Sequence, residues 1–115
     1  MSVEALTLET CAGQAEGCRI LRLNGPLTLQ GVFAFQTALR SDPPPSLVLD
    51  LTSVPYMDSA GMGAIINYFV SCQRNGRKLV VAGVNARVME LFRLTKVDHL
   101  LTIVPTIADA ENALA

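Results

Sequence analysis

Two spacings of apolar residues alternate along the chain. Residues 3–10 and 18–23 alternate apolar and polar positions, which predicts two half-buried strands, and the Gly-containing segment between them predicts an antiparallel hairpin. The runs at 47–51, 78–84 and 101–104 are mostly apolar and too short for helices, so they predict strands buried within a sheet.

Helical spacing follows each strand from the second onward. Apolar residues three or four positions apart predict helices over 29–39 (from Val32, Phe33, Phe35 and Leu39), from Met62 to Asn75, around 88–92 and over 107–114. The expected N-caps are Thr28, Asn85 and Thr106, and Gly76 is expected to end the second helix in the left-handed conformation. A strand-helix-strand unit normally has parallel strands. The order therefore predicts an α/β fold: a mixed, mostly parallel sheet of about five strands with about four helices.

Length and composition narrow the class of protein. The 115 residues suit a single domain, 1–115. Half of the residues are hydrophobic and 17% are charged, which argues against disorder and favours a surface that meets a partner. The net charge is −1 and the basic residues are scattered, so we expect no nucleic-acid partner.

No apolar stretch approaches the roughly eighteen residues of a membrane span, and no leader pattern opens the chain. We therefore expect a cytoplasmic protein without a membrane span. Cys11, Cys18 and Cys72 are odd in number and lack the spacing of metal or redox sites, which predicts free thiols in a reducing compartment. We expect no metal and no cofactor.

The segment 54–63 joins the strand at 47–51 to the next helix. Asp58 and Ser59 fall where a helix exposes its first unpaired N–H groups. Ligand sites in parallel sheets lie at the carboxyl ends of strands. The turn at 25–28 follows the preceding parallel strand in the same way, so we expect the two turns to be neighbours.

Glycines follow Ser59 inside the predicted helix. Alanine would be favoured over Gly61 and Gly63 by about 1 kcal/mol at each position. Their presence indicates a close backbone approach, either by the sheet or by a partner.

Ser59 has two interpretations from its position alone. It can cap the helix by accepting a backbone N–H bond, worth about 1 kcal/mol. It can also accept a phosphoryl group, whose charge of about −1.5 to −2 suits the positive end of a helix but is repelled by Asp58 and by a partner surface matched to neutral serine.

Two enzymatic interpretations are disfavoured. A serine hydrolase would need a base, and the single histidine, His99, is accompanied by no Gly-x-Ser-x-Gly elbow around Ser59. The run at 60–63 is too short for a phosphate-binding P-loop and lacks its Lys-Ser/Thr ending. We expect a binding protein rather than an enzyme.

Residues 50–63, Asp-Leu-Thr-Ser-Val-Pro-Tyr-Met-Asp-Ser-Ala-Gly-Met-Gly, resemble the signature of the STAS domain family, the anti-sigma factor antagonists and their relatives. The resemblance extends over nearly the whole chain, including 76–84 and 91–95, and is strongest from residue 47 onward. It implies a small binding protein phosphorylated on Ser59 by a serine kinase that doubles as an anti-sigma factor. This kinase has a histidine-kinase-like ATPase domain, and a phosphatase reverses the modification. The unphosphorylated antagonist binds the kinase and frees the sigma factor. We expect the antagonist itself to be a monomer or weak dimer.

One position departs from this family pattern. The family often has Gly-Glu-Leu/Ile-Asp after the second strand, whereas this chain has Gly25-Pro26-Leu27-Thr28, so Thr28 replaces an acidic neighbour of the phosphorylation turn. An unphosphorylated docking subunit of a stressosome or of an ABC-type lipid transporter is therefore the alternative function. In either case the expected site comprises Ser59, Asp58 and Thr28 and a partner surface at Tyr56, Met57, Ala60, Gly61, Met62, Gly63, Ile66 and Asn67.

Overall fold

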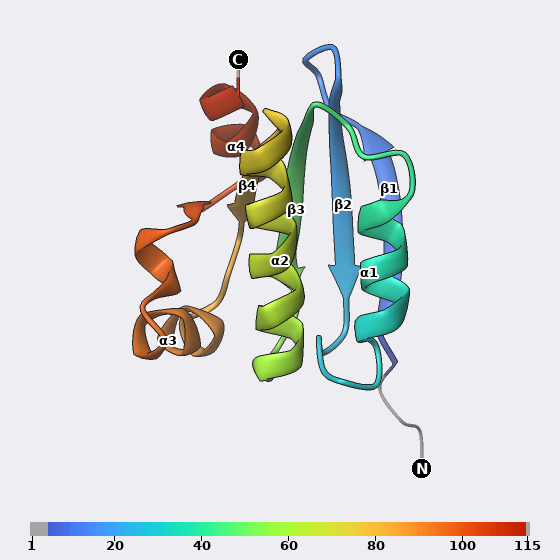
Figure 1. Cartoon of the computed structure of the whole chain (residues 1–115). Coiled ribbons are helices and arrows are strands. Elements are labelled where there is room, and N and C mark those ends of the chain that lie inside the picture. The colour runs from blue at the N-terminus through green and yellow to red at the C-terminus, as the bar shows by residue number, and fades with distance from the viewer. Residues whose placement is uncertain (1–4, 115) are drawn as a thin grey trace.

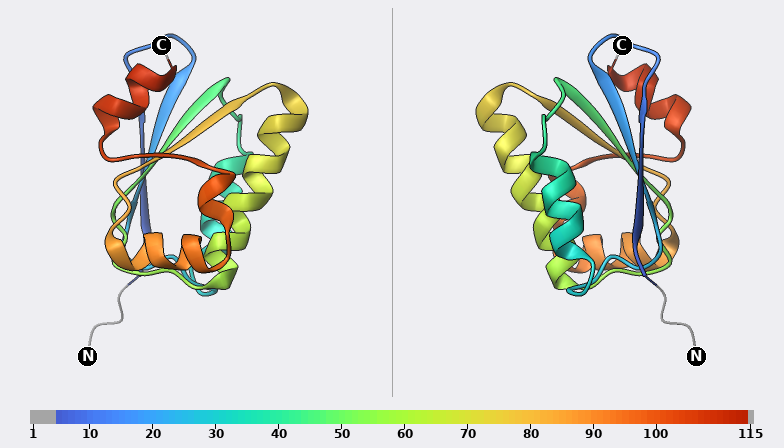
Figure 2. Two further views of the ribbon diagram at one scale, coloured as in Figure 1. Left: turned by 90° about the vertical axis from the view of Figure 1, so that its left-hand side faces the viewer. Right: turned by 90° about the vertical axis from the view of Figure 1, so that its right-hand side faces the viewer.

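The computed structural model describes residues 5–114, which form one five-stranded sheet with helices on both faces (Figures 1 and 2). In chain order the elements are β1 (Thr7–Ala12), β2 (Cys18–Asn24), α1 (Val32–Arg40), β3 (Ser46–Ser53), α2 (Ser59–Asn75), β4 (Lys78–Ala82), α3 (Ala86–Leu94), the short 3-10 helix η1 (Val97–His99), β5 (Thr102–Val104) and α4 (Ile107–Leu114). This is the mixed α/β fold predicted from the sequence.

The sheet has the order β1-β2-β3-β4-β5. The first pair is antiparallel and the other three are parallel. Figure 2 shows α1 and α2 on one face and α4 on the other. Because β2 and β3 are parallel neighbours, their carboxyl ends lie together, and the loops that follow them leave the sheet at the same end.

Each face of the sheet has its own apolar core. The larger core lies beneath α1, α2 and α3 and includes the fully buried Phe35, Leu49 and Phe92. The smaller core lies beneath α4, where Val48 and Ala110 are fully buried. Alternation along a strand explains the division, because neighbouring residues point to opposite faces.

Asp50 is a buried charged residue in the middle of β3, 3% exposed. Its carboxylate accepts hydrogen bonds from Arg22 Nε at 2.9 Å and from the backbone and hydroxyl of Thr52 at 3.0 and 2.6 Å. Burial raises the pKa of this carboxyl, but these bonds outweigh burial and hold the pKa below its usual value.

Most predicted helix ends are confirmed. Asn85 accepts from Val88 N at 2.8 Å, Thr106 Oγ1 accepts from Asp109 N at 3.1 Å, and Gly76 ends α2 with φ 67°. The cap predicted at Thr28 is wrong, because α1 begins only at Val32 after Gly31, which makes no side-chain cap bond.

Other expectations need adjustment. The sequence predicts the first strand over 3–10, and residues 3 and 4 lie outside the described residues. The observed strand β1 is Thr7–Ala12, and Ala12 pairs with Arg19. Phe33 is 73% exposed and therefore does not belong to the apolar face of α1. Of the helices described, none is long and apolar enough to cross a bilayer.

Candidate functional site

The loops after β2 and β3 are joined by backbone hydrogen bonds. Leu27 N donates to Tyr56 O, and Asp58 N donates to Leu27 O, each at 3.2 Å. Leu27 and Met57 form a parallel bridge beyond the ends of the strands. The predicted adjacency of the two turns is thus confirmed, and the β2–α1 loop is bound directly to the start of α2.

Both carboxylate oxygens of Asp58 accept hydrogen bonds at this junction. Oδ1 accepts from Gly61 N within α2, and Oδ2 accepts from Leu29 N in the β2–α1 loop, each at 3.0 Å. Asp58 is therefore the N-cap of α2 and, at the same time, a clamp on the neighbouring loop.

Ser59 is not the helix cap. It is the first residue of α2 and is exposed to solvent, while the capping bond is made by Asp58. The capping interpretation of Ser59 is therefore wrong, because the residue before it supplies the acceptor. A serine at this position is accessible at the positive end of a helix.

Thr28 lies in the β2–α1 loop and is half-buried. Its carbonyl accepts from Gly31 N at 3.0 Å in a turn that precedes α1. Its neighbour Leu29 makes the contact with Asp58, which keeps Thr28 in the loop that borders the junction.

The two glycines of the junction differ in their surroundings. Gly61 is buried, and a Cβ there would overlap the carbonyl oxygen of Leu27 and approach Leu27 Cγ to 2.7 Å. A Cβ at Gly63 would meet nothing within 4 Å. Gly61 is thus explained by the packing of α2 on the β2–α1 loop, whereas Gly63 leaves an uncovered patch on the helix.

The predicted partner-contact residues separate by burial. Met57 is 9% exposed and Gly61 is also buried, so these two shape the junction without forming its surface. Asn67 is exposed, and the remaining predicted residues are half-buried, namely Tyr56, Ala60, Met62, Gly63 and Ile66.

Exposed apolar residues that the sequence interpretation did not assign to the site border the junction. Leu29 is 64% exposed, and its N–H makes the contact with Asp58. Phe33 is 73% exposed in the first turn of α1, the helix that follows this loop. The sequence could have indicated the exposure of Phe33. The buried residues Val32, Phe35 and Leu39 define one side of α1, and Phe33 does not lie on that side.

The end of α3 borders the other side of α2. Thr95 Oγ1 lies 3.1 Å from Met62 Sδ, and the adjacent Leu94 is 73% exposed. The guanidinium of Arg87 lies 5.0 Å from the centre of the Tyr56 ring, a cation–π distance. Leu29 from the β2–α1 loop, Thr95 from the end of α3 and Arg87 from α3 thus each contact a residue of the segment 56–62.

His99, the base required by a hydrolase mechanism, belongs to the short helix η1 before β5. Its side chain is 84% exposed, and its Nε2 lies 3.9 Å from Asp98 Oδ1 in the same turn. These contacts give His99 no orientation toward Ser59.

Comparisons with curated proteins find relatives at moderate identity. The chain is 37% identical over 57 residues to the anti-sigma-B factor antagonist of Listeria monocytogenes, a match that covers 50% of each chain. It is 30% identical over 67 residues to the protein of the same name from Staphylococcus aureus, covering 58% of this chain and 62% of the relative. The chain therefore spans about half to three fifths of the curated relatives that it matches.

Solved structures share the fold. An anti-sigma factor antagonist from Mycobacterium paratuberculosis superposes with a TM-score of 0.79 at 22% identity, over 93% of both chains. The STAS domain of a SulP transporter from Vibrio cholerae gives 0.71 at 23% identity, over 89% of this chain and 84% of that one. The phosphorylated form of the Bacillus cell fate determinant SpoIIAA gives 0.69 at 16% identity, over 96% and 100%.

The STAS domain family model matches residues 12–110. This range includes β2 through the first half of α4 and the whole junction built on Asp58 and Ser59. The chain therefore belongs to the STAS domain family.

Proposed function

We propose that this chain is an anti-sigma factor antagonist that docks on an anti-sigma factor serine kinase through the start of α2. Phosphorylation of Ser59 releases it from this partner. One observation supports the proposal above the others. Asp58 caps α2, so Ser59 is not needed as the cap and is exposed at the first position of the helix.

The start of α2 can receive a phosphoryl group without refolding. The four N-terminal N–H groups of the helix belong to Asp58, Ser59, Ala60 and Gly61. Leu27 O accepts from the first and Asp58 Oδ1 accepts from the last. The N–H groups of Ser59 and Ala60 have no intrahelical acceptor, so they are the donors for a phosphate on Ser59.

The same modification opposes docking. A phosphoserine adds about −1.5 to −2 charges next to the Asp58 carboxylate. Leu29 is exposed beside Asp58, and the exposed Leu94 adjoins Thr95, which contacts Met62 of α2. Their burial against a partner would bring the new charge into a desolvated interface. Phosphorylation therefore weakens binding through local charge, and the fold need not change.

In this proposal the chain contributes a surface and the chemistry belongs to its partners. The ATP is bound by the histidine-kinase-like ATPase domain of the kinase, and a separate phosphatase returns the antagonist to its binding form. Unphosphorylated antagonist occupies the kinase and thereby frees a sigma factor for transcription.

The decisive experiment incubates the purified chain with its cognate kinase and ATP and maps the product by mass spectrometry. Phosphate on Ser59 is expected, and a Ser59→Ala variant should remain unmodified. A wild-type chain that stays unmodified while the kinase phosphorylates a control substrate would refute the switch.

Binding of the same kinase by calorimetry tests the charge argument. Ser59→Ala should keep the wild-type affinity, and Ser59→Asp should lose about tenfold, equal to about 1.4 kcal/mol. Gln73→Glu, which adds the same charge at the exposed far end of α2, is the matched control and should bind normally. Equal affinity for Ser59→Ala and Ser59→Asp would remove the electrostatic argument.

Thr28 favours a second candidate function, because it replaces the acidic residue that commonly borders the phosphorylation turn. In this alternative the same surface docks permanently on a scaffold or on an ATPase, as a stressosome subunit or as a subunit of an ABC-type lipid transporter. Co-purification from native lysate distinguishes the two functions: a histidine-kinase-like ATPase supports the antagonist, and an ABC ATPase supports the transporter subunit.

A further inference from the structure

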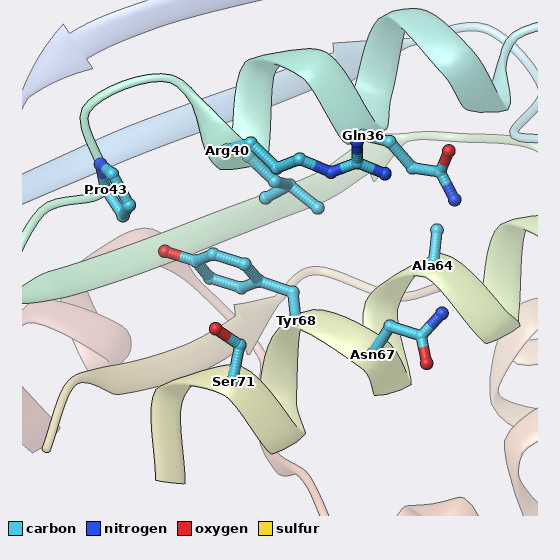
Figure 3. Close-up of a pocket in the computed structure, with 8 residues that line it drawn as sticks. Gln36, Arg40, Pro43, Ala64, Asn67, Tyr68 and Ser71 are labelled. Carbon is cyan, nitrogen blue, oxygen red and sulfur yellow. The ribbon is translucent and has the colours of Figure 1, made fainter. Parts of the chain in front are cut away.

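A pocket lies between α1 and α2, away from Ser59 itself, and shares Asn67 with the predicted partner surface. Its volume is about 370 Å³, within the range of small-molecule sites. Leu39, Pro43, Ala64 and the ring of Tyr68 supply its apolar walls, and its polar groups come from Gln36, Arg40, Asn67 and Ser71 (Figure 3). A mostly apolar pocket with a few convergent polar groups is the usual form of a binding site.

Tyr68 forms one wall of this pocket and carries an unused polar group. The side chain is 8% exposed, and its hydroxyl makes no hydrogen bond with any of the described residues. Burial raises the pKa of the phenol to about 12, and a polar contact with the neighbouring Cys72 thiol, which does not meet hydrogen-bond geometry, adds to the shift. The hydroxyl is therefore protonated at neutral pH and available as a donor. A phenylalanine would fill the same space without leaving a polar group unpaired, so the hydroxyl calls for an acceptor.

The polar groups of the pocket lie toward its two ends. Figure 3 shows the guanidinium of Arg40 directed toward Gln36, whereas the hydroxyl of Tyr68 points the other way, toward Pro43. Arg40 is the charged side chain of the lining, and it favours an anion at its end. The flat ring of Tyr68 lies between the two ends and favours an aromatic ligand.

We propose that the α1–α2 pocket binds a small aromatic carboxylate with a second oxygen at its far end. The carboxylate accepts hydrogen bonds from Arg40 and Gln36. The aromatic ring packs against Tyr68 and Leu39, and the far oxygen accepts the hydrogen bond of the Tyr68 hydroxyl. The hydroxyl is covered in the structure and points toward Pro43, so binding requires the ligand to displace the side chains that cover it at this edge. This proposal does not depend on phosphorylation of Ser59.

Three probes of one shape test the two ends of the pocket by amide chemical shifts. 4-Hydroxyphenylacetate has both polar ends, phenylacetate lacks the far oxygen, and tyramine replaces the anion by a cation. We expect saturable shifts with 4-hydroxyphenylacetate along α1, along α2 and at Ser41 and Asp42, weaker binding of phenylacetate, and none of tyramine. An absence of saturable shifts with 4-hydroxyphenylacetate, shifts located elsewhere, or equal binding of tyramine would overturn the proposal.

Variants assign each end to its residue. Tyr68→Phe should weaken 4-hydroxyphenylacetate about tenfold, the value of one hydrogen bond to the ligand, and leave phenylacetate unchanged. Arg40→Gln should weaken both acids, whereas Arg74→Gln, at the exposed end of α2 and outside the pocket lining, should weaken neither. An unchanged affinity of Tyr68→Phe for 4-hydroxyphenylacetate would mean that the Tyr68 hydroxyl makes no hydrogen bond with the ligand, and the proposal would be wrong.

Discussion

The two glycines at the start of α2 offer a matched test of how this helix meets the β2–α1 loop. Gly61 and Gly63 lie two residues apart in one helix, and alanine gains about 1 kcal/mol over glycine in a helix interior. The intrinsic gain from Gly61→Ala and from Gly63→Ala is therefore similar, and a difference between the variants reports what each new methyl group contacts.

The contacts of the two methyl groups differ sharply. At Gly63 the methyl enters open space, so Gly63→Ala should raise the free energy of unfolding by about 1 kcal/mol. At Gly61 it overlaps the Leu27 carbonyl oxygen, a backbone atom held by Asp58 N, so relief requires the loop to move. Such overpacking costs typically about 1–3 kcal/mol. After the helical gain, Gly61→Ala should range from neutral to a loss of about 2 kcal/mol, which places it about 1–3 kcal/mol below Gly63→Ala.

Urea unfolding followed by circular dichroism measures both variants against the wild type. Amide shifts of Leu29 should also change in Gly61→Ala, because the loop that it pushes carries the N–H bonded to Asp58. A Gly61→Ala variant as stable as Gly63→Ala, with Leu29 unperturbed, would refute the packing of α2 on the loop.

Four further substitutions probe other buried or capping groups by the same unfolding assay. Asp58→Ala should cost about 1–2 kcal/mol, because it removes the helix cap and the bond to Leu29, whereas Ser59→Ala should be nearly neutral; equal losses would contradict the assignment of the cap. Tyr68→Phe should stabilise the ligand-free protein by about 1 kcal/mol, because it removes an unpaired hydroxyl, and a loss would show that the hydroxyl is already paired. Asp50 has a lowered pKa in the folded state, so its charged form contributes stability above the pKa of the unfolded chain, and this contribution is lost as pH falls through the folded value. The stability gap between wild type and Asp50→Asn should therefore shrink on acidification, and a gap independent of pH would contradict this.

Features that depend on neighbours a few residues away were predictable from the sequence. Asn85 and Thr106 cap their helices by bonds to residues three positions on, and Gly76 ends α2 through its own backbone conformation. The order of strands and helices follows from the spacing of apolar residues, which is also a local property. The segment around Ser59 is likewise a candidate site from the sequence alone, because its polar residues and glycines follow a buried strand.

Features that depend on residues far apart in the chain required the tertiary structure. Parallel pairing of β2 and β3 brings Leu29 to the Asp58 carboxylate across 29 positions. Leu29 is thereby held in the loop, and α1 begins only at Val32, so Thr28 does not cap it. The same packing buries Gly61 and leaves Gly63 open, although both are glycines in one helix.

The sequence by itself determined the fold class, most of the helix ends and the segment that carries the candidate site. Only the tertiary structure decided that Asp58 caps α2 and leaves Ser59 exposed, and that the hydroxyl of Tyr68 is buried without a partner. The physical reason is that the spacing of residues along the chain fixes which face of a helix or strand is apolar. The side chains and backbone atoms that pack against that face come from segments distant in the sequence, and only the tertiary structure shows which segments these are.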